Sequence, residues 1–83
     1  MTLLYFAWVR SRIGIAAEDI TPPGDVTDVT TLIVWLRTRG PGYALAFADL
    51  DALRVAVNQE HAGFDAAIKQ GDEVAFFPPV TGG

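Results

Sequence analysis

The last residues of this chain hold its most reactive candidate group. The sequence ends in Gly82-Gly83, so the α-carboxylate lies on a residue without a side chain and is ionised at neutral pH. Such a carboxylate can attack the α-phosphate of ATP, and a sulfur donor can convert the resulting acyl-adenylate to a thiocarboxylate. Glycine accepts backbone angles that other residues cannot, which suits a tail that enters a narrow pocket on another protein. A frayed terminus without a function is the alternative, and the physics of chain ends leaves both open.

A short apolar strand and two prolines precede this tail. Val74 to Phe77 is apolar, and Pro78-Pro79 end the strand because proline has no N–H to donate to a sheet. Phe76 and Phe77 are neighbours, so one must face a core and the other the opposite surface. The prolines also stiffen the start of the tail. We expect residues 80–83 to be mobile in the free protein and ordered only inside a partner.

Composition excludes several other chemistries. The 83 residues include no cysteine, which excludes disulfides and a thiolate nucleophile. His61 is the only histidine and Ser11 the only serine, which leaves almost no material for a hydrolytic triad. The sequence also lacks a phosphate-binding loop of the GxxxxGK type, so adenylation requires a partner enzyme. The net charge of −4 argues against binding to nucleic acid or anionic membranes. Without a long apolar run or a basic leader, a cytoplasmic protein is expected.

The first half of the chain predicts two strands and a helix. Leu3 to Val9 is an unbroken apolar run of strand length, and Ile15 to Thr21 is a weaker second strand that forms a hairpin with it. Apolar residues at 29, 32, 33 and 36 form one stripe of a helix over residues 29–39, with Thr27 as its N-cap. The β-branched residues of this segment leave a strand as the alternative, but the stripe and the glycine that follows it favour the helix.

The second half predicts another helical segment and further strands. Residues 42–50 are rich in alanine and predicted to be helical. Their large side chains are expected in the core: Tyr43, Leu45, Phe47 and Leu50. Residues 53–57 alternate as a half-buried strand does, and a turn at 58–60 leads to a short edge strand at 61–62. Asp72 and Glu73 are expected to cap the turn before the last strand or to meet a basic partner surface.

Three segments of the chain resemble one known family. The ending DEVAFFPPVTGG, the opening LLYFAWVRSRIG and the interior AVNQE resemble the small subunits of molybdopterin synthase, which are ubiquitin-like sulfur carriers. The segments lie at the matching places and cover most of the chain. The resemblance implies an α+β fold of the β-grasp type in a single domain over residues 1–83. In that fold the first and last strands are parallel neighbours at the centre of a mixed sheet, and one main helix packs across one face.

The resemblance also implies which residues act. Gly83 is implied as the reactive residue, which is adenylated and then thiocarboxylated. The residues implied to thread into the partner's active site are Pro79, Val80, Thr81 and Gly82. The residues implied in docking to partners are Phe6, Arg10, His61, Phe76 and Phe77. Many relatives have an apolar or aromatic residue at the position of His61, so this departure is expected to weaken or retune docking. The alternative for His61 is a solvated turn residue without a part in docking.

The implied partners supply the remaining chemistry. They are the large synthase subunit, an adenylyltransferase of the ubiquitin-activating type that uses ATP, and a sulfurtransferase or cysteine desulfurase system. Sulfur then passes to a cyclic pterin precursor (precursor Z) to build the dithiolene, and the chain itself is expected to bind no cofactor or metal. Three alternatives stay open. They are a carrier for tRNA thiolation or thiamine synthesis, a modifier joined to lysines, and a pure binding module.

Overall fold

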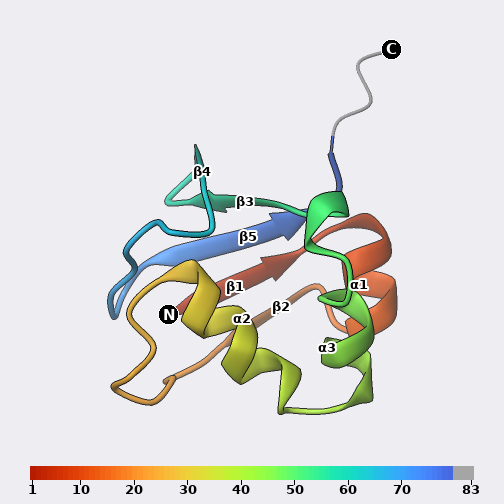
Figure 1. The fold of residues 1–83 in the computed structure, drawn as a ribbon, viewed down its shortest axis with the longest axis horizontal. Coiled ribbons are helices and arrows are strands. Elements are labelled where there is room, and N and C mark those ends of the chain that lie inside the picture. Colours follow the sequence, from red (N-terminus) through yellow and green to blue (C-terminus); the bar gives the residue numbers. More distant parts are fainter. Residues whose placement is uncertain (80–83) are drawn as a thin grey trace.

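The computed structural model describes residues 1–79, and the expected mobility of residues 80–83 lies outside the described residues. The chain folds into one mixed sheet with helices packed against it (Figure 1). The strands are β1 (Thr2–Tyr5), β2 (Ala17–Asp19), β3 (Arg54–Val57), β4 (Glu60–Ala62) and β5 (Glu73–Phe77). The helices are α1 (Ala7–Ile13), α2 (Val29–Arg37), α3 (Pro41–Ala46) and the 3₁₀ helix η1 (Leu50–Ala52). Among the described residues, no helix is long and apolar enough to cross a membrane.

The sheet has the strand order β2-β1-β5-β3-β4, with β5 at its centre. β1 and β5 are parallel, and Leu3 is paired with Val74. The pairs β1–β2, β3–β5 and β3–β4 are antiparallel. The expected parallel pairing of the first and last strands at the centre of a β-grasp sheet is therefore confirmed.

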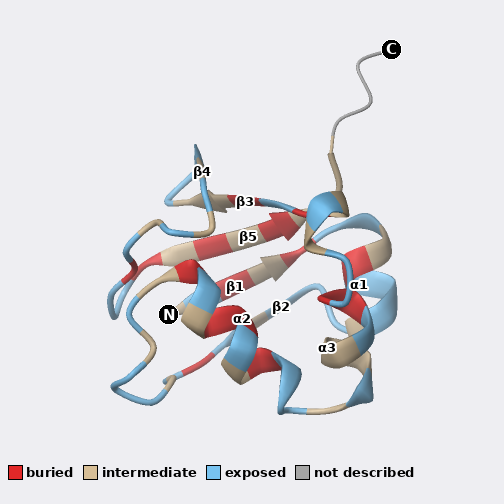
Figure 2. Cartoon of the chain, viewed as in Figure 1, coloured by how far each residue is buried: buried red, intermediate tan, exposed pale blue. Residues whose placement is uncertain are grey.

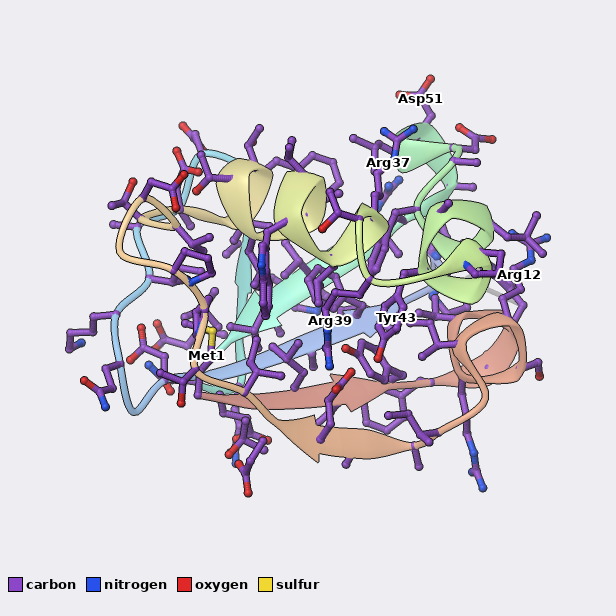
Figure 3. The ribbon with its side chains drawn as sticks, turned by 90° about the horizontal axis from the view of Figure 1, so that it is seen from below. Met1, Arg12, Arg37, Arg39, Tyr43 and Asp51 are labelled. Carbon is purple, nitrogen blue, oxygen red and sulfur yellow. The ribbon has the colours of Figure 1, made fainter. Side chains whose placement is uncertain are left out.

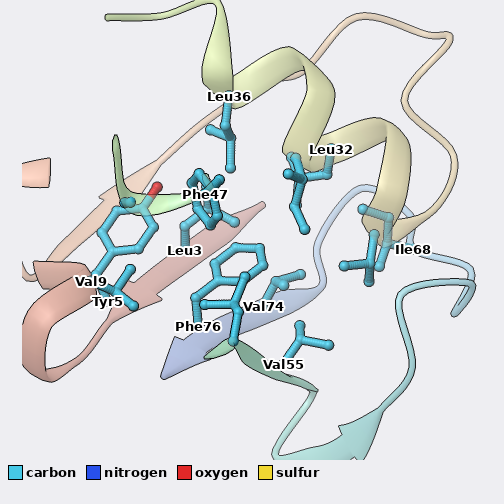
Figure 4. Close-up of a cluster of buried hydrophobic side chains, with 14 of the residues drawn as sticks. Leu3, Tyr5, Val9, Leu32, Leu36, Phe47, Val55, Ile68, Val74 and Phe76 are labelled. Carbon is cyan, nitrogen blue, oxygen red and sulfur yellow. The ribbon is translucent and has the colours of Figure 1, made fainter. Parts of the chain in front are cut away.

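The core lies between the sheet and α2, whose apolar stripe predicted the helix (Figure 4). The buried residues of α2 are Val29, Leu32, Ile33 and Leu36. Asp28 begins the helix: its side chain accepts a hydrogen bond from the Thr31 backbone N–H at 2.8 Å, and the Thr31 hydroxyl accepts one from the Asp28 N–H at 3.1 Å. The predicted cap at Thr27 is thus wrong by one residue. Figure 2 shows the buried residues of α2, β1 and β5 in red.

The predicted strand over residues 3–9 is wrong in its second half. β1 ends at Tyr5, Ala7 has a positive φ of 52°, and α1 then runs to Ile13. Gly14 ends this helix in the left-handed conformation with φ 99°, a backbone state that costs glycine little. Val9, the last residue of the apolar run, is fully buried in the core, but it reaches the core from helix α1 and not from a strand. The two strands pair as expected, but a helix rather than a short turn connects them.

Other boundaries also differ from the expected ones. The second strand covers only Ala17–Asp19, and α2 ends at Arg37. The segment expected to be helical over residues 42–50 divides into α3 and η1, and Leu45 is 56% exposed instead of lying in the core. Strands β3, β4 and β5 lie where the sequence predicted them, within one residue at each end.

Candidate functional site

The central strand β5 carries the chain toward its C-terminus. Its residues alternate strictly: Val74 and Phe76 are buried in the core, while Ala75 and Phe77 are partly exposed on the other face. Pro78 and Pro79 follow and are partly exposed. Neither proline can donate a ladder hydrogen bond, so pairing stops at Phe77 and the chain leaves the sheet there. We call residues 77–79 the C-terminal exit.

The face of the sheet opposite the core carries a row of small and apolar side chains. Register places Leu4 of β1 beside Ala75 of β5, and Ala75 beside Ala56 of β3. Ala56 in turn is paired with His61 of β4, so all four side chains point to the same face. We call Leu4, Ala56, His61, Ala75 and Phe77 the open face. Apart from His61, which is exposed, these side chains are apolar and partly buried, and Phe77 makes the surface continuous with the C-terminal exit.

His61 and Phe77 meet on the open face. Their ring centroids are 5.5 Å apart, with the ring planes at 84°. Phe77 is paired with Arg54, and Ala56 lies two residues further along β3 on the same face. Because the side chain of Ala56 is only a methyl group, the rings of His61 and Phe77 have room to approach each other. The structure therefore brings together two of the predicted docking residues, His61 and Phe77.

Phe6 and Arg10 lie beside the C-terminal exit. The Phe6 N–H donates a hydrogen bond to the Phe76 carbonyl at 3.1 Å, which fixes the start of α1 against the end of β5. Phe6 is 49% exposed, and Arg10 is exposed one helical turn further on. Two of the predicted docking residues thus flank the exit from the side of β1.

Phe76 was predicted as a docking residue, and the structure shows that this is wrong. Its side chain is 0% exposed and lies between two other core rings (Figure 4). The Phe47 ring meets it edge-on at 5.0 Å, and the Tyr5 ring lies at 6.3 Å with nearly parallel planes. Of the two adjacent phenylalanines, Phe77 is the one that reaches the surface.

Asp72 organises the turn that starts β5. Its carboxylate accepts hydrogen bonds from the Lys69 backbone N–H at 2.9 Å and from the Asn58 side-chain amide at 3.1 Å. The Asn58 side chain in turn accepts a hydrogen bond from the Glu73 N–H at 3.0 Å. The hydrogen bond from Asn58, followed by that from Lys69, lowers the pKa of Asp72. The expected capping role of Asp72 is confirmed.

A partly buried polar network on the core side ties β2 to the helices, and the sequence analysis missed it. The Glu18 carboxylate accepts hydrogen bonds from Tyr43 at 2.6 Å, Tyr5 at 2.8 Å and Arg39 at 2.8 Å. Figure 3 shows Arg39 and Tyr43 side by side above β2. These residues come from four segments of the chain, so no local pattern brings them together. The network fixes the edge strand β2 and is structural.

The network also shifts the ionisation of its members. Burial acts to raise the pKa of Glu18, but the hydrogen bonds from Tyr43, Tyr5 and Arg39 together outweigh it and lower that pKa. Burial, and then the hydrogen bond to Glu18, raises the pKa of Tyr43 to about 12. The pKa of Tyr5 is raised by the same two causes. Glu18 is therefore a carboxylate, and both tyrosines are neutral donors, at physiological pH.

Two hollows lie on the surface of residues 1–79, away from the C-terminal exit. Within residues 1–79, no cluster of three His, Asp or Glu side chains could hold a metal ion. The larger hollow, about 380 Å³, lies along the outer side of α2, and a smaller one, about 190 Å³, lies by the loop after β2. Neither hollow includes a residue of the open face.

Comparison with known proteins places these features in a family. The model of the ThiS family matches residues 3–83. The molybdopterin synthase sulfur carrier subunit of Escherichia coli is 42% identical over 81 residues, covering 98% of this chain and 96% of the relative.

Two solved structures extend the likeness to the fold. The structure of SAMP1 from Haloferax volcanii superposes with a TM-score of 0.77 at 30% identity, covering 100% of this chain and 98% of that one. The complex of subunits 1 and 2 of the molybdopterin-converting factor from Helicobacter pylori contains a chain with a TM-score of 0.64 at 20% identity. The alignment covers 99% of this chain and 96% of that one, and shows a shared fold. This chain belongs to the ThiS family of ubiquitin-like β-grasp proteins.

Proposed function

We propose that this chain is the sulfur carrier subunit of a molybdopterin synthase, and that its reactive residue is Gly83. The observation that carries the proposal is the path of β5. The central strand runs out of the sheet at Phe77, beside an apolar open face, and leads directly to the sequence VTGG. A core strand that ends next to a docking surface holds the tail in a defined place relative to a partner. The name of the Escherichia coli relative supports the same function.

The proposed chemistry begins at the terminal carboxylate. A carboxylate oxygen of Gly83 attacks the α-phosphate of ATP, and pyrophosphate leaves, which gives an acyl-adenylate. The terminal sulfur of a donor persulfide then attacks the acyl carbon and AMP leaves, which gives an acyl disulfide. A second thiol of the donor system attacks the donor's sulfur in that disulfide, so that a donor disulfide forms and the thiocarboxylate is released. The thiocarboxylate sulfur attacks a carbon of the cyclic pterin precursor, and the bond from that carbon to an oxygen substituent breaks as the oxygen leaves. Water then cleaves the acyl–sulfur bond, leaving sulfur on the pterin and the carboxylate on Gly83.

The catalytic groups for these steps come from partners. The chain has no cysteine and no GxxxxGK loop, so it holds neither a sulfur-carrying thiol nor that phosphate site. An adenylyltransferase of the ubiquitin-activating type is proposed to bind the ATP. A sulfurtransferase or cysteine desulfurase system is proposed to supply the sulfur. Because ATP is required, we assign the protein to the cytoplasm.

The large synthase subunit is proposed to dock on the open face and to receive the tail. Phe77, Phe6 and His61 supply the contact, and Arg10 lies at its margin. Residues 79–82 then thread into the partner's active site. At about 3.3 Å per residue, the four residues after Pro79 extend roughly 13 Å, which suffices to enter a pocket next to the docking surface. The solved Helicobacter pylori complex pairs a chain of the same fold with subunit 2 of its converting factor.

Intact-mass spectrometry tests the proposed function. The purified chain is incubated with the cognate adenylyltransferase, ATP and a sulfur donor. We expect the mass change of one oxygen replaced by sulfur. A variant that lacks Gly83 should gain no sulfur, because its carboxylate stops one residue short of the reacting atoms. A reaction without ATP is the control. An unchanged mass for the full chain, or sulfur on the shortened chain, would contradict the proposal.

A second candidate function is that of a protein modifier. The likeness to the solved structure of small archaeal modifier protein 1 from H. volcanii favours it. A modifier forms an amide between Gly83 and a lysine amine of another protein, with AMP as the leaving group. The same mass measurement, made on proteins recovered from cells, separates the two functions. A carrier shows the sulfur exchange, and a modifier shows adducts in which a lysine carries the C-terminal glycine.

A further inference from the structure

His61 is the one ionisable ring on an otherwise apolar part of the open face. The strand register places His61 in a row with Ala56, Ala75 and Leu4. The centroids of the His61 and Phe77 rings are 5.5 Å apart. His61 is the only histidine of the chain. Histidine is the side chain that ordinarily changes charge between about pH 5 and 8. His61 therefore places an ionisable side chain in the middle of the proposed docking surface.

The charged groups around His61 do not offer it a counter-ion on that face. On β3, Arg54 points to the same face, two residues from Ala56, and its guanidinium donates to the carbonyl oxygens of Asp51 and Leu53. On β5, Glu73 points to the open face, but at the far end from Phe77. On β4 itself, Glu60 points to the opposite face. The ion pairs found within residues 1–79, Arg39–Glu18 and Lys69–Asp72, do not include His61.

We propose that the open face docks with His61 uncharged, and that the partner surface covering His61 is apolar and carries no carboxylate against it. The inference deepens the proposed function, since it takes the large synthase subunit as the partner. Ala56, Ala75 and Leu4 give that subunit a flat apolar surface, and covering it removes water from the His61 ring. A charged imidazolium without water or a partner is unfavourable there, and Arg54 on the same face adds like-charge repulsion.

The proposal predicts that docking weakens on acidification. A complex that requires the uncharged ring loses affinity as pH falls through the range in which histidines take up a proton. With an ordinary histidine, the loss between about pH 7.5 and about pH 5.5 is roughly tenfold. Replacing His61 by leucine keeps an apolar side chain beside Phe77 and removes the titration. Replacing it by glutamine keeps a polar side chain and also removes the titration.

The test is calorimetry of the full chain with the cognate large subunit between about pH 5.5 and about pH 7.5. Three carriers are compared: the wild-type chain, His61→Leu and His61→Gln. The ratio of wild-type to variant affinity at each pH cancels protonation of the large subunit itself. Glu60→Gln is the matched control, because it alters the neighbouring residue on the other face of β4 and should keep the wild-type profile. Circular dichroism at each pH verifies that every chain is folded.

We expect the wild-type chain and Glu60→Gln to lose about tenfold more affinity at low pH than either His61 variant. Parallel profiles for all four chains would overturn the inference while leaving the proposed partner in place. A wild-type chain that binds more tightly than the variants at low pH would also overturn it, because a partner carboxylate would then meet the charged ring. If the wild-type chain binds the large subunit at no pH, the proposed function fails, and the inference fails with it.

Discussion

Both faces of the sheet carry aromatic side chains, but those on the covered face form the core and those on the open face are available to a partner. On the covered face, Phe76, Tyr5 and Phe47 pack together with no exposed area or almost none. On the open face, the rings of Phe77 and His61 form one partly exposed contact beside Ala56 and Ala75. Phe76 and Phe77 are adjacent and chemically identical, so their difference comes from strand alternation alone. The comparison separates the residues that hold the fold from those available to a partner.

The largest expected effect comes from the covered face. Phe76→Ala removes a ring from the centre of the core and leaves a cavity between Tyr5 and Phe47. We expect the free energy of unfolding to fall by about 3–5 kcal/mol, which urea denaturation measures. Phe76→Leu retains most of the volume and should cost clearly less. Equal stability of Phe76→Ala and the wild-type chain would show that the core is not where the structure places it.

Gly42→Ala tests how tightly the helices close the end of the core. A Cβ at Gly42 of α3 would lie 2.5 Å from the Arg12 carbonyl oxygen of α1, a contact that backbone atoms cannot relieve without moving. We expect a loss of about 1–3 kcal/mol in unfolding free energy. Gly24→Ala is the control, because nothing lies within 4 Å of the added methyl group. If both substitutions have the same small effect, α1 and α3 are not in the observed contact.

Glu18→Gln probes the polar network on the covered face. The substitution removes the charge that three donors share, and we expect about 1–3 kcal/mol lower stability at neutral pH. The folded-state pKa of Glu18 is lowered, so its contribution is present above the unfolded value of about 4.5 and disappears as pH falls through the lower folded value. The stability difference from the wild-type chain should therefore shrink below about pH 4.5.

Thermal denaturation of both chains across that pH range measures the difference. Exposed Glu60→Gln on β4 is the matched control, and it should change stability little at any pH. A Glu18→Gln difference that stays constant as the pH falls would mean that the carboxylate charge does not stabilise the network.

The sequence predicted the architecture because its strongest signals are periodic. The stripe of α2 and the alternation of β5 each repeat often enough to define one buried face. Helix α1 escaped prediction because it has two turns and follows an apolar strand without a polar break. Its only apolar pair at helical spacing is Val9 with Ile13. Ala7 with its positive φ, which changes the chain direction, leaves no mark in the sequence.

The candidate site was predictable in part for the same reason. Alternation required one of Phe76 and Phe77 to face outward, but it gave no means of choosing between them. The choice depends on register with β1 and β3, where Phe76 is paired with Tyr5 and Val55. The Glu18 network was not predictable, because Tyr43 lies 25 residues from Glu18 in the sequence. Contacts of that range are set by the packing of α3 against α1 and α2.

Phe77→Ala should change stability least and binding most, and it tests the central claim most directly. The ring is partly exposed, so we expect the free energy of unfolding to fall by no more than about 1 kcal/mol. Covering the ring with a partner contributes about 1.5–3 kcal/mol. Since about 1.4 kcal/mol is a factor of ten, binding should weaken at least about tenfold.

The decisive measurement is calorimetry of wild-type chain and Phe77→Ala with the cognate large synthase subunit, with the fold of both verified by circular dichroism. The account predicts a folded Phe77→Ala chain whose affinity is at least about tenfold lower than that of the wild-type chain. A folded Phe77→Ala chain that binds the large subunit as tightly as the wild-type chain would contradict it.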